Sequence, residues 1–119
     1  MIAHSVFDEA LACVISETSR LYICKGQPST MADVTKLAIG HKALPHMTGP
    51  VDVPGGRAAV VGAIEDGTVT AKGEAKYWCL TGNGRLLACE PLGNKDPLVL
   101  VPGISFTLPS IHIRLVNSN

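Results

Sequence analysis

The stretch from Gly67 to Glu90 contains the clearest alternation of apolar and polar positions in the chain. Even positions are polar and odd positions are small or apolar, until Trp78 interrupts the pattern. A period of two predicts β-strands with one face on a core and the other face in water. Asn83-Gly84 supplies the positive φ angles that a two-residue turn requires, so we expect an antiparallel hairpin around it.

The N-terminal segment shows a helical period instead. Residues 5–18 predict one amphipathic helix, with Ser5 as a candidate N-cap and Asp8 as its partner in a short capping box. Residues 21–24 then predict a short strand. The segment 30–39 fits either a short helix or an irregular segment, because its apolar residues have helical spacing while it also contains β-branched residues. The apolar stripe of the first helix consists of Phe7, Ala10, Leu11, Val14 and Ile15.

Residues 40–56 contain three prolines and four glycines. This composition predicts a long loop, or an extended arm in a polyproline-like conformation. Loops of this length are often functional, and the apolar residues of this one need cover from its own sheet or from a neighbour. We therefore predict a partner interface here, together with the tryptophan of the hairpin. The candidate interface residues are Leu44, His46, Met47, Val51, Val53 and Trp78.

From Arg57 onward, turn signals recur about every 8–12 residues, which is typical of a sandwich or barrel. One turn is expected at Glu65-Asp66-Gly67. A helix followed only by strands predicts a mainly β fold. We expect a single antiparallel β-sandwich or barrel-like domain, residues 1–119, with one N-terminal amphipathic α-helix and an antiparallel β region at 57–116. The predicted strands are 57–64, 68–81, 85–90, 97–101, 104–108 and 111–116.

Charge narrows the range of partners. Ten basic and ten acidic residues give a net charge of zero, and only 17% of residues are charged. A nucleic-acid-binding protein needs a basic field, and the chain shows none. No apolar run is long enough for a membrane span. Sparse, balanced charge favours association, so we expect a homo-oligomer, with a trimer as one option, and neither nucleic acid nor membrane as partner.

The four cysteines match no zinc-binding spacing. With a two-residue turn at 83–84, Cys79 would face Ala88 and Cys89 would face Trp78. The two sulfur atoms would then lie on opposite faces of the hairpin. We expect all four thiols to be reduced and to pack as small hydrophobic groups.

No pattern in the sequence predicts catalysis. The four histidines do not have the spacing of metal ligands, and no nucleophile or phosphate-binding motif occurs. Glu74 and Glu90 on neighbouring strands are expected to be partners of basic residues across the sheet. Trp78 and Tyr77 should point to opposite faces, so that one enters the core and the other emerges. We expect Trp78 to fill the core or a subunit contact; an exposed tryptophan would instead anchor an interface or stack on a sugar. We predict a protein that is not an enzyme and has no cofactor or metal.

Several motifs along the chain resemble those of small proteins from tailed-phage and prophage genomes. The strongest is the order RLxIC followed by QP-[ST] in residues 19–30. The others are the Asp8-Glu9-Ala10-Leu11 segment, the Gly56-Arg57-Ala58-Ala59-Val60 strand, the G-x-A-x-[HY]-W-x-L pattern from Gly73 to Leu80, the return strand Arg85–Ala88 and the FTLP strand from Phe106 to Ile113.

This resemblance implies a structural component of a virion, made in the host cytoplasm. Within that class, a neutral domain with a Pro/Gly-rich arm favours a capsid decoration (cement) protein that binds the lattice of the major capsid protein or other virion proteins. The alternative is a tail or head-fibre component, including a receptor-binding knob. A small enzyme or regulator is the third class.

Overall fold

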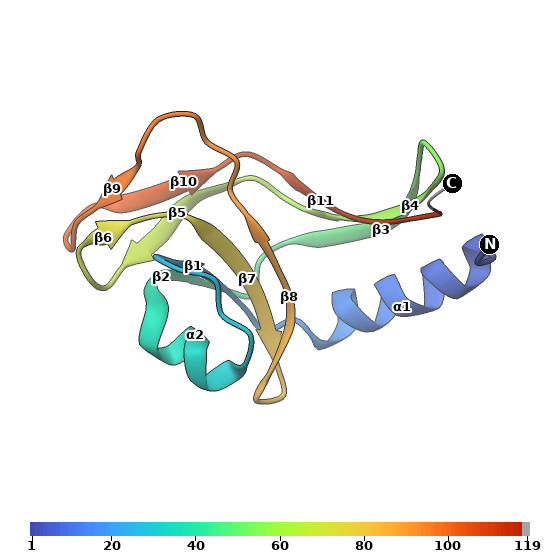
Figure 1. Cartoon of the computed structure of the whole chain (residues 1–119), viewed down its shortest axis with the longest axis horizontal. Helices are drawn as coiled ribbons and strands as arrows, with labels where there is room; N and C mark the ends of the chain where they lie inside the picture. The colour runs from blue at the N-terminus through green and yellow to red at the C-terminus, as the bar shows by residue number, and fades with distance from the viewer. Residues whose placement is uncertain (118–119) are drawn as a thin grey trace.

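The computed structural model describes residues 1–117. It is mainly β and antiparallel, with an N-terminal helix, which confirms the predicted fold class (Figure 1). The elements in chain order are α1 (His4–Glu17), β1 (Arg20–Cys24), α2 (Met31–Leu37), β2 (Ala38–Ala43), β3 (Met47–Val53), β4 (Gly56–Val61), β5 (Ile64–Val69), β6 (Gly73–Glu74), β7 (Tyr77–Gly82), β8 (Arg85–Pro91), β9 (Val99–Leu100), β10 (Ser105–Leu108) and β11 (Ile111–Val116).

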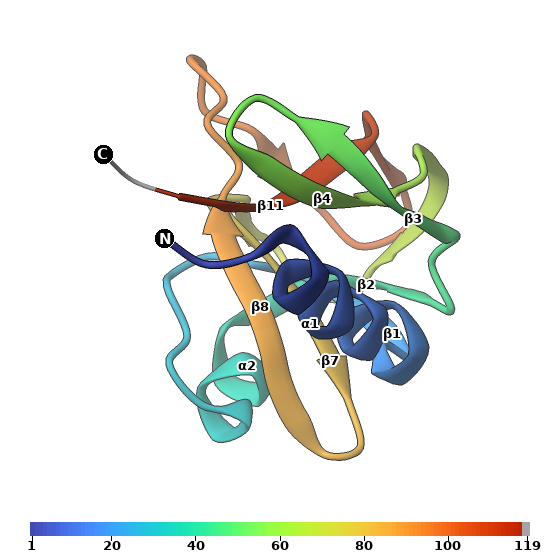
Figure 2. The same cartoon turned by 90° about the vertical axis from the view of Figure 1, so that its right-hand side faces the viewer.

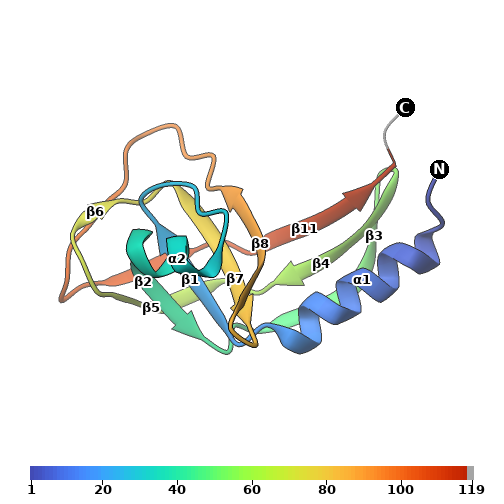
Figure 3. The same cartoon turned by 60° about the horizontal axis from the view of Figure 1, so that its bottom comes forward.

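The strands form a six-stranded sheet in the order β10-β5-β2-β1-β7-β8 and a three-stranded sheet in the order β11-β4-β3. β6 and β9 pair separately at one end of the molecule. Three short connections link the two sheets: β2–β3 and β10–β11 lead from the larger sheet into the smaller one, and β4–β5 leads back. The smaller sheet is therefore a continuation of one side of the larger sheet, bent away from it (Figure 3).

Strand β1 separates two hydrophobic clusters. Leu21 and Ile23 face the main core, opposite Leu80 and Trp78 of β7. Cys24 and the half-buried Tyr22 face the other way, into a smaller cluster closed by Val34 of α2. Both faces of the sheet are covered, so adjacent residues of β1 and β7 can all be apolar.

The helix α2 resolves the ambiguity of residues 30–39. Thr30 is its N-cap, and its Oγ1 accepts a hydrogen bond from the Asp33 amide at 3.3 Å. The Asp33 carboxylate in turn accepts from the Ser29 amide at 3.1 Å. These two bonds satisfy backbone donors at the start of the helix, and residues from Ala38 onward join the sheet.

The helix α1 begins one residue earlier than predicted, and its predicted cap is wrong. Its N-cap is Ala3, which makes no side-chain bond, and the Asp8 carboxylate instead accepts a hydrogen bond from Arg57 Nε at 2.7 Å. Arg57 also donates to Asp52 at 2.6 Å. Phe7 and Leu11 are the buried residues of the helix. The helix lies along β3 and β4 (Figure 2).

The predicted loop or arm at 40–56 is wrong. This segment contains most of β2, all of β3 and the start of β4. Its glycines and prolines are compatible with a sheet for local reasons. Pro50 lies on β3, an edge strand, at a shift of register where its missing N–H removes no ladder hydrogen bond. Gly55, with φ of +78°, makes the turn into β4.

The single strand predicted over 68–81 is also wrong. It is divided into the end of β5, the short β6 and the start of β7. β5 and β7 are separated by two other strands in the sheet, so residues 70–76 must cross between them. The turn predicted at Glu65-Asp66-Gly67 lies inside β5. Gly67 is required there because a Cβ would collide with the Phe106 ring.

The turn at Asn83-Gly84 is confirmed, with φ of 54° and 73°. The register that the turn predicts holds only for the first two residue pairs. Leu80 then faces Ala88 while Thr81 faces Leu86, so Leu87 is an extra residue in a β-bulge. The shift places Cys79 directly opposite Cys89. The prediction that their sulfur atoms lie on opposite faces is therefore wrong.

We expect the substitution Gly84→Ala to lower the free energy of unfolding by about 1–2 kcal/mol. A Cβ at Gly84 would meet no atom within 4 Å, so the cost comes from its φ of +73° alone. Urea denaturation measures this difference. Gly26→Ala is the matched control, because its Cβ would make only ordinary contact with Leu37 and its φ is not in the left-handed region. Equal stability of the two variants would contradict the turn geometry.

Candidate partner-binding site

An elongated hollow, here called the trough, lies between β8 and the β10–β11 connection. It has two parts, with cavity volumes of about 530 and 280 Å³. The larger part is lined by Pro91 and Leu92 on one side and by residues 107–111 on the other. The smaller part lies between β8, β11 and the Leu11 face of α1. Both parts share Trp78 and Glu90, so they meet at this point.

The trough is bordered by strand edges. In the part of the chain that the structure describes, β8 is an outer strand of the larger sheet and β11 is an outer strand of the smaller one. The outward backbone groups of an edge strand can pair with an added strand. An extended peptide in the trough would gain main-chain hydrogen bonds and would bury its apolar side chains in the hollow.

Trp78 lies at the base of this trough. Its side chain is 3% exposed, and it belongs to the main core. The adjacent Tyr77 points to the other face, where it contacts the smaller cluster. The hypothesis that Trp78 projects from the surface as a partner contact is therefore wrong for this structure.

A second surface, here called the apolar tip, lies beside the trough. It consists of Leu98, Val99, Val101 and Ile104, whose side chains are 37–54% exposed. Leu100, in the middle of the same segment, is buried. Leu98 also lines the trough, so the two surfaces are continuous. The tip is at the end of the molecule where β6 and β9 pair, far from the two chain termini (Figure 1).

The other predicted interface residues do not form one surface with Trp78. Leu44, 76% exposed, and the exposed His46 lie in the β2–β3 connection. Met47 packs against the main core, Val51 is exposed on β3 and Val53 is half-buried. These five residues lie on the edge strand β3 of the smaller sheet and in the connection that precedes it, while Trp78 lies in the main core.

The apolar tip was missed by the sequence analysis, although a signal exists. The segment PLVLVPGI has consecutive aliphatic residues with no polar residue between them. A strand covered on one face would alternate, so such a run must be either covered on both faces or exposed on one. The trough has no comparable signal, because its walls come from segments that are distant in the chain.

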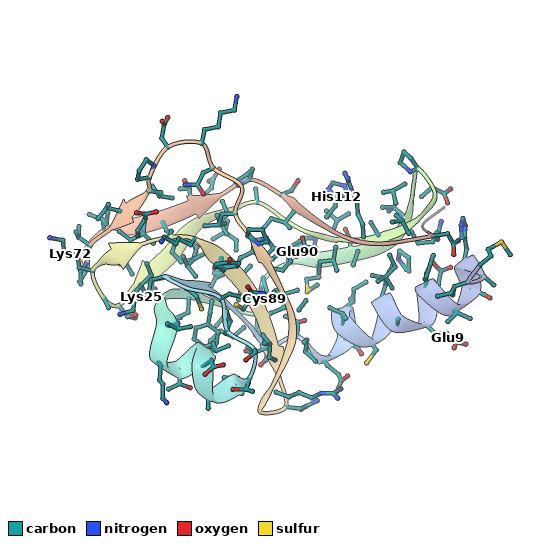
Figure 4. The ribbon with its side chains drawn as sticks, viewed as in Figure 1. Glu9, Lys25, Lys72, Cys89, Glu90 and His112 are labelled. Carbon is teal, nitrogen blue, oxygen red and sulfur yellow. The ribbon has the colours of Figure 1, made fainter. Side chains whose placement is uncertain are left out.

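The charged groups around these surfaces are few. Glu90 on β8 and His112 and Arg114 on β11 are exposed (Figure 4). The ion pairs of the described residues lie elsewhere: Lys42 with Asp66 at 2.9 Å, Arg85 with Glu17 at 2.6 Å, and Arg57 with Asp8 at 2.7 Å and with Asp52 at 2.6 Å. Among residues 1–117, no three His, Cys, Asp or Glu side chains form a group that could hold a metal ion. The surfaces are thus suited chemically to apolar and main-chain recognition.

Comparisons with protein-family models, with curated proteins and with solved structures find no match for this chain. Neither helix within residues 1–117 has the length and apolar character needed to cross a membrane. The fold and the candidate site therefore define a mainly β domain with an exposed apolar surface.

The burial of Trp78 is directly measurable, because it is the only tryptophan of the chain. We expect its fluorescence emission to be shifted to shorter wavelength than in the urea-unfolded chain, with little quenching by iodide, since 3% exposure excludes water from the ring. The unfolded chain provides the fully exposed reference. Similar quenching constants in both states would place the ring on the surface and contradict this geometry.

Proposed function

We propose that this protein is a structural component of a tailed-bacteriophage virion, a capsid decoration (cement) protein that binds the lattice of the major capsid protein and stabilises the head. The apolar tip carries this proposal, because four of the seven residues from 98 to 104 expose aliphatic side chains. An exposed apolar cluster of this kind on a small domain is typical of a contact with another protein. The motif resemblance to phage proteins supplies the class of partner.

The trough adds a second mode of contact to the same surface. An extended segment of a capsid subunit could pair with the free edge of β8 or β11 and place side chains in the hollow beside Leu98. Main-chain pairing requires no particular charge on either partner. This agrees with a chain whose net charge is zero.

Repetition would make such a contact effective. Each copy would bury a modest area, and a lattice offers many equivalent sites, so small contributions would sum over the shell. A compact domain of 119 residues with few charged groups is suited to such a role.

The alternative is a tail or head-fibre component, including a receptor-binding knob. The motif resemblance is equally compatible with it. A knob that used Trp78 as its receptor contact would have to expose that ring, which is 3% exposed here. This observation favours the decoration role.

We expect the triple variant Val99→Thr, Val101→Thr, Ile104→Thr to bind heads that lack this protein roughly 10- to 100-fold more weakly than the unmodified chain. Threonine keeps the β-branched shape but replaces a methyl group of valine, or the ethyl group of isoleucine, by a hydroxyl group, so the strand geometry is retained while apolar contact is lost. Co-sedimentation with the heads measures the affinity.

Leu44→Asn is the matched control, because Leu44 is the most exposed residue of the other candidate surface. Its φ of 48° is one that asparagine adopts readily. If Leu44→Asn weakens binding and the tip variant does not, the interface is the β2–β3 region. If neither variant changes binding, the apolar tip is not the contact.

The copy number in purified virions, determined by quantitative mass spectrometry, distinguishes the two roles. A fixed ratio to the major capsid protein, such as one copy per subunit or per three subunits, would support decoration. A few copies per particle would support a tail or fibre position, and absence from the particle would contradict both.

A further inference from the structure

Three of the four cysteines come together beneath α2. Cys79 Sγ lies 3.4 Å from Cys89 Sγ and 3.8 Å from Cys24 Sγ. The three residues come from the adjacent strands β1, β7 and β8, and Val34 of α2 packs on them. All are free thiols, and Cys13 is separate and exposed on α1. The fold has thus gathered residues that are up to 65 positions apart in the chain (89 minus 24).

We propose that Cys79 and Cys89 form an oxidisable thiol pair. This pair is a modification site in which a disulfide bond forms when the protein is exposed to a peroxide. The bulge at Leu87 makes them direct cross-strand partners. Direct partners in an antiparallel pair have Cα atoms about 4.5–5.5 Å apart. A disulfide spans about 4.4–6.8 Å between Cα atoms, so the bond requires mainly a rotation of the side chains.

Cys24 is close to the pair, but its position is different. Cys24 is the partner of Tyr77, and Cys79 is the partner of Tyr22, so Cys24 and Cys79 are diagonal neighbours. Diagonal neighbours have Cα atoms about 7–8 Å apart, which is beyond the reach of an undistorted disulfide. The structure therefore selects the 79–89 pair from among the three thiols.

The exposure of the three thiols to solvent also favours the 79–89 pair. Cys24 and Cys79 are fully buried, whereas Cys89 is half-buried on the outer strand β8 (Figure 4). Hydrogen peroxide would reach the Cys89 sulfur first, giving a sulfenic acid and one water molecule. The Cys79 sulfur then attacks the Cys89 sulfur, the S–S bond forms, and a second water molecule leaves. In total, two thiols and one peroxide give one disulfide and two water molecules.

The reaction should be slow at neutral pH and faster in alkali. Burial raises the pKa of the Cys89 thiol. The hydrogen bond to Cys24, together with burial, raises the pKa of Cys79. Because the thiolate is the reactive form, few reactive groups exist at pH 7. In a reducing cytoplasm the pair stays reduced. Oxidation after release from the cell would follow only if the proposed virion location holds.

Peptide mapping of the purified protein tests the pairing without any partner. Trypsin cuts after Arg20, Lys25, Lys76, Arg85 and Lys95, among other sites, so each cysteine is on its own peptide: 1–20, 21–25, 77–85 and 86–95. We expect the folded protein, treated with hydrogen peroxide and then alkylated, to yield peptide 77–85 linked to 86–95, with Cys24 alkylated and the exposed Cys13 in no link to another of these peptides. A main product that links 21–25 to either peptide would overturn the proposal, as would sulfinic acid at Cys89 without a link.

The urea-unfolded chain is the control that shows whether the fold determines which cysteines pair. In urea, the loops between 13 and 24 and between 79 and 89 have nearly equal length, so chain entropy favours both pairs alike. We expect the 13–24 link in urea and not in the folded protein. Its appearance in the folded protein at a similar yield would mean that chain proximity, and not the bulge, determines the product.

Variants separate the roles of the three thiols. Cys24→Ala should leave the 79–89 link intact, whereas Cys79→Ala and Cys89→Ala should abolish it. Oxidation should also raise the Tm of the unmodified protein by roughly 5–15 °C, reversibly with dithiothreitol, because the bond closes a loop in the unfolded chain. A lower Tm after oxidation, or loss of the link in Cys24→Ala, would overturn the proposal.

Discussion

The pairing of β1 with β7 is the constraint on which the rest of this structure depends. Side chains of the two strands alternate between two faces, and neither face can remain in water: Leu21 and Leu80 on one side are 0% exposed, and so are Cys24 and Cys79 on the other. One face is covered by the smaller sheet, which includes Ile113, together with Phe106 of β10, and the other face is covered by α2. Removing either cover would expose a complete row of apolar side chains, so the two small layers stabilise each other through the strands between them.

Features that depend on neighbours in the chain were predictable from the sequence. The first helix, the strand 21–24, the final strand and the Asn83-Gly84 turn all follow from local periodicity or from the conformational preferences of two residues. The capping residue of α1 was not predictable, because Asp8 is held by Arg57, which lies 49 positions away. The Asp8 carboxylate thus forms a long-range ion pair and not a local capping interaction.

Features that depend on distant contacts were not predictable in the same way. The alternation over 68–81 is real, but it cannot show that the chain must cross two strands between Val69 and Tyr77. The prolines and glycines of 40–56 suggested a loop. A sheet accepts such residues mainly in an edge strand, and the local sequence does not show which strand will be at the edge. The bulge at Leu87 likewise changes the partner of Cys79 without any local signal. The apolar tip was not predicted for the same reason, since its exposure depends on what the rest of the chain leaves uncovered.

Hydrogen bonds from one side chain join Asn117 to Ile2, near the other end of the chain. Asn117 Oδ1 accepts a hydrogen bond from the Ile2 amide at 2.7 Å, and its Nδ2 donates to the Ile2 carbonyl at 3.1 Å. The backbone thus forms an almost closed ring. Any peptide fused before or after these residues would emerge from the same place, at the end of the molecule opposite the apolar tip (Figure 1). In the proposed decoration role, with the tip as the contact, such a peptide would project away from the shell.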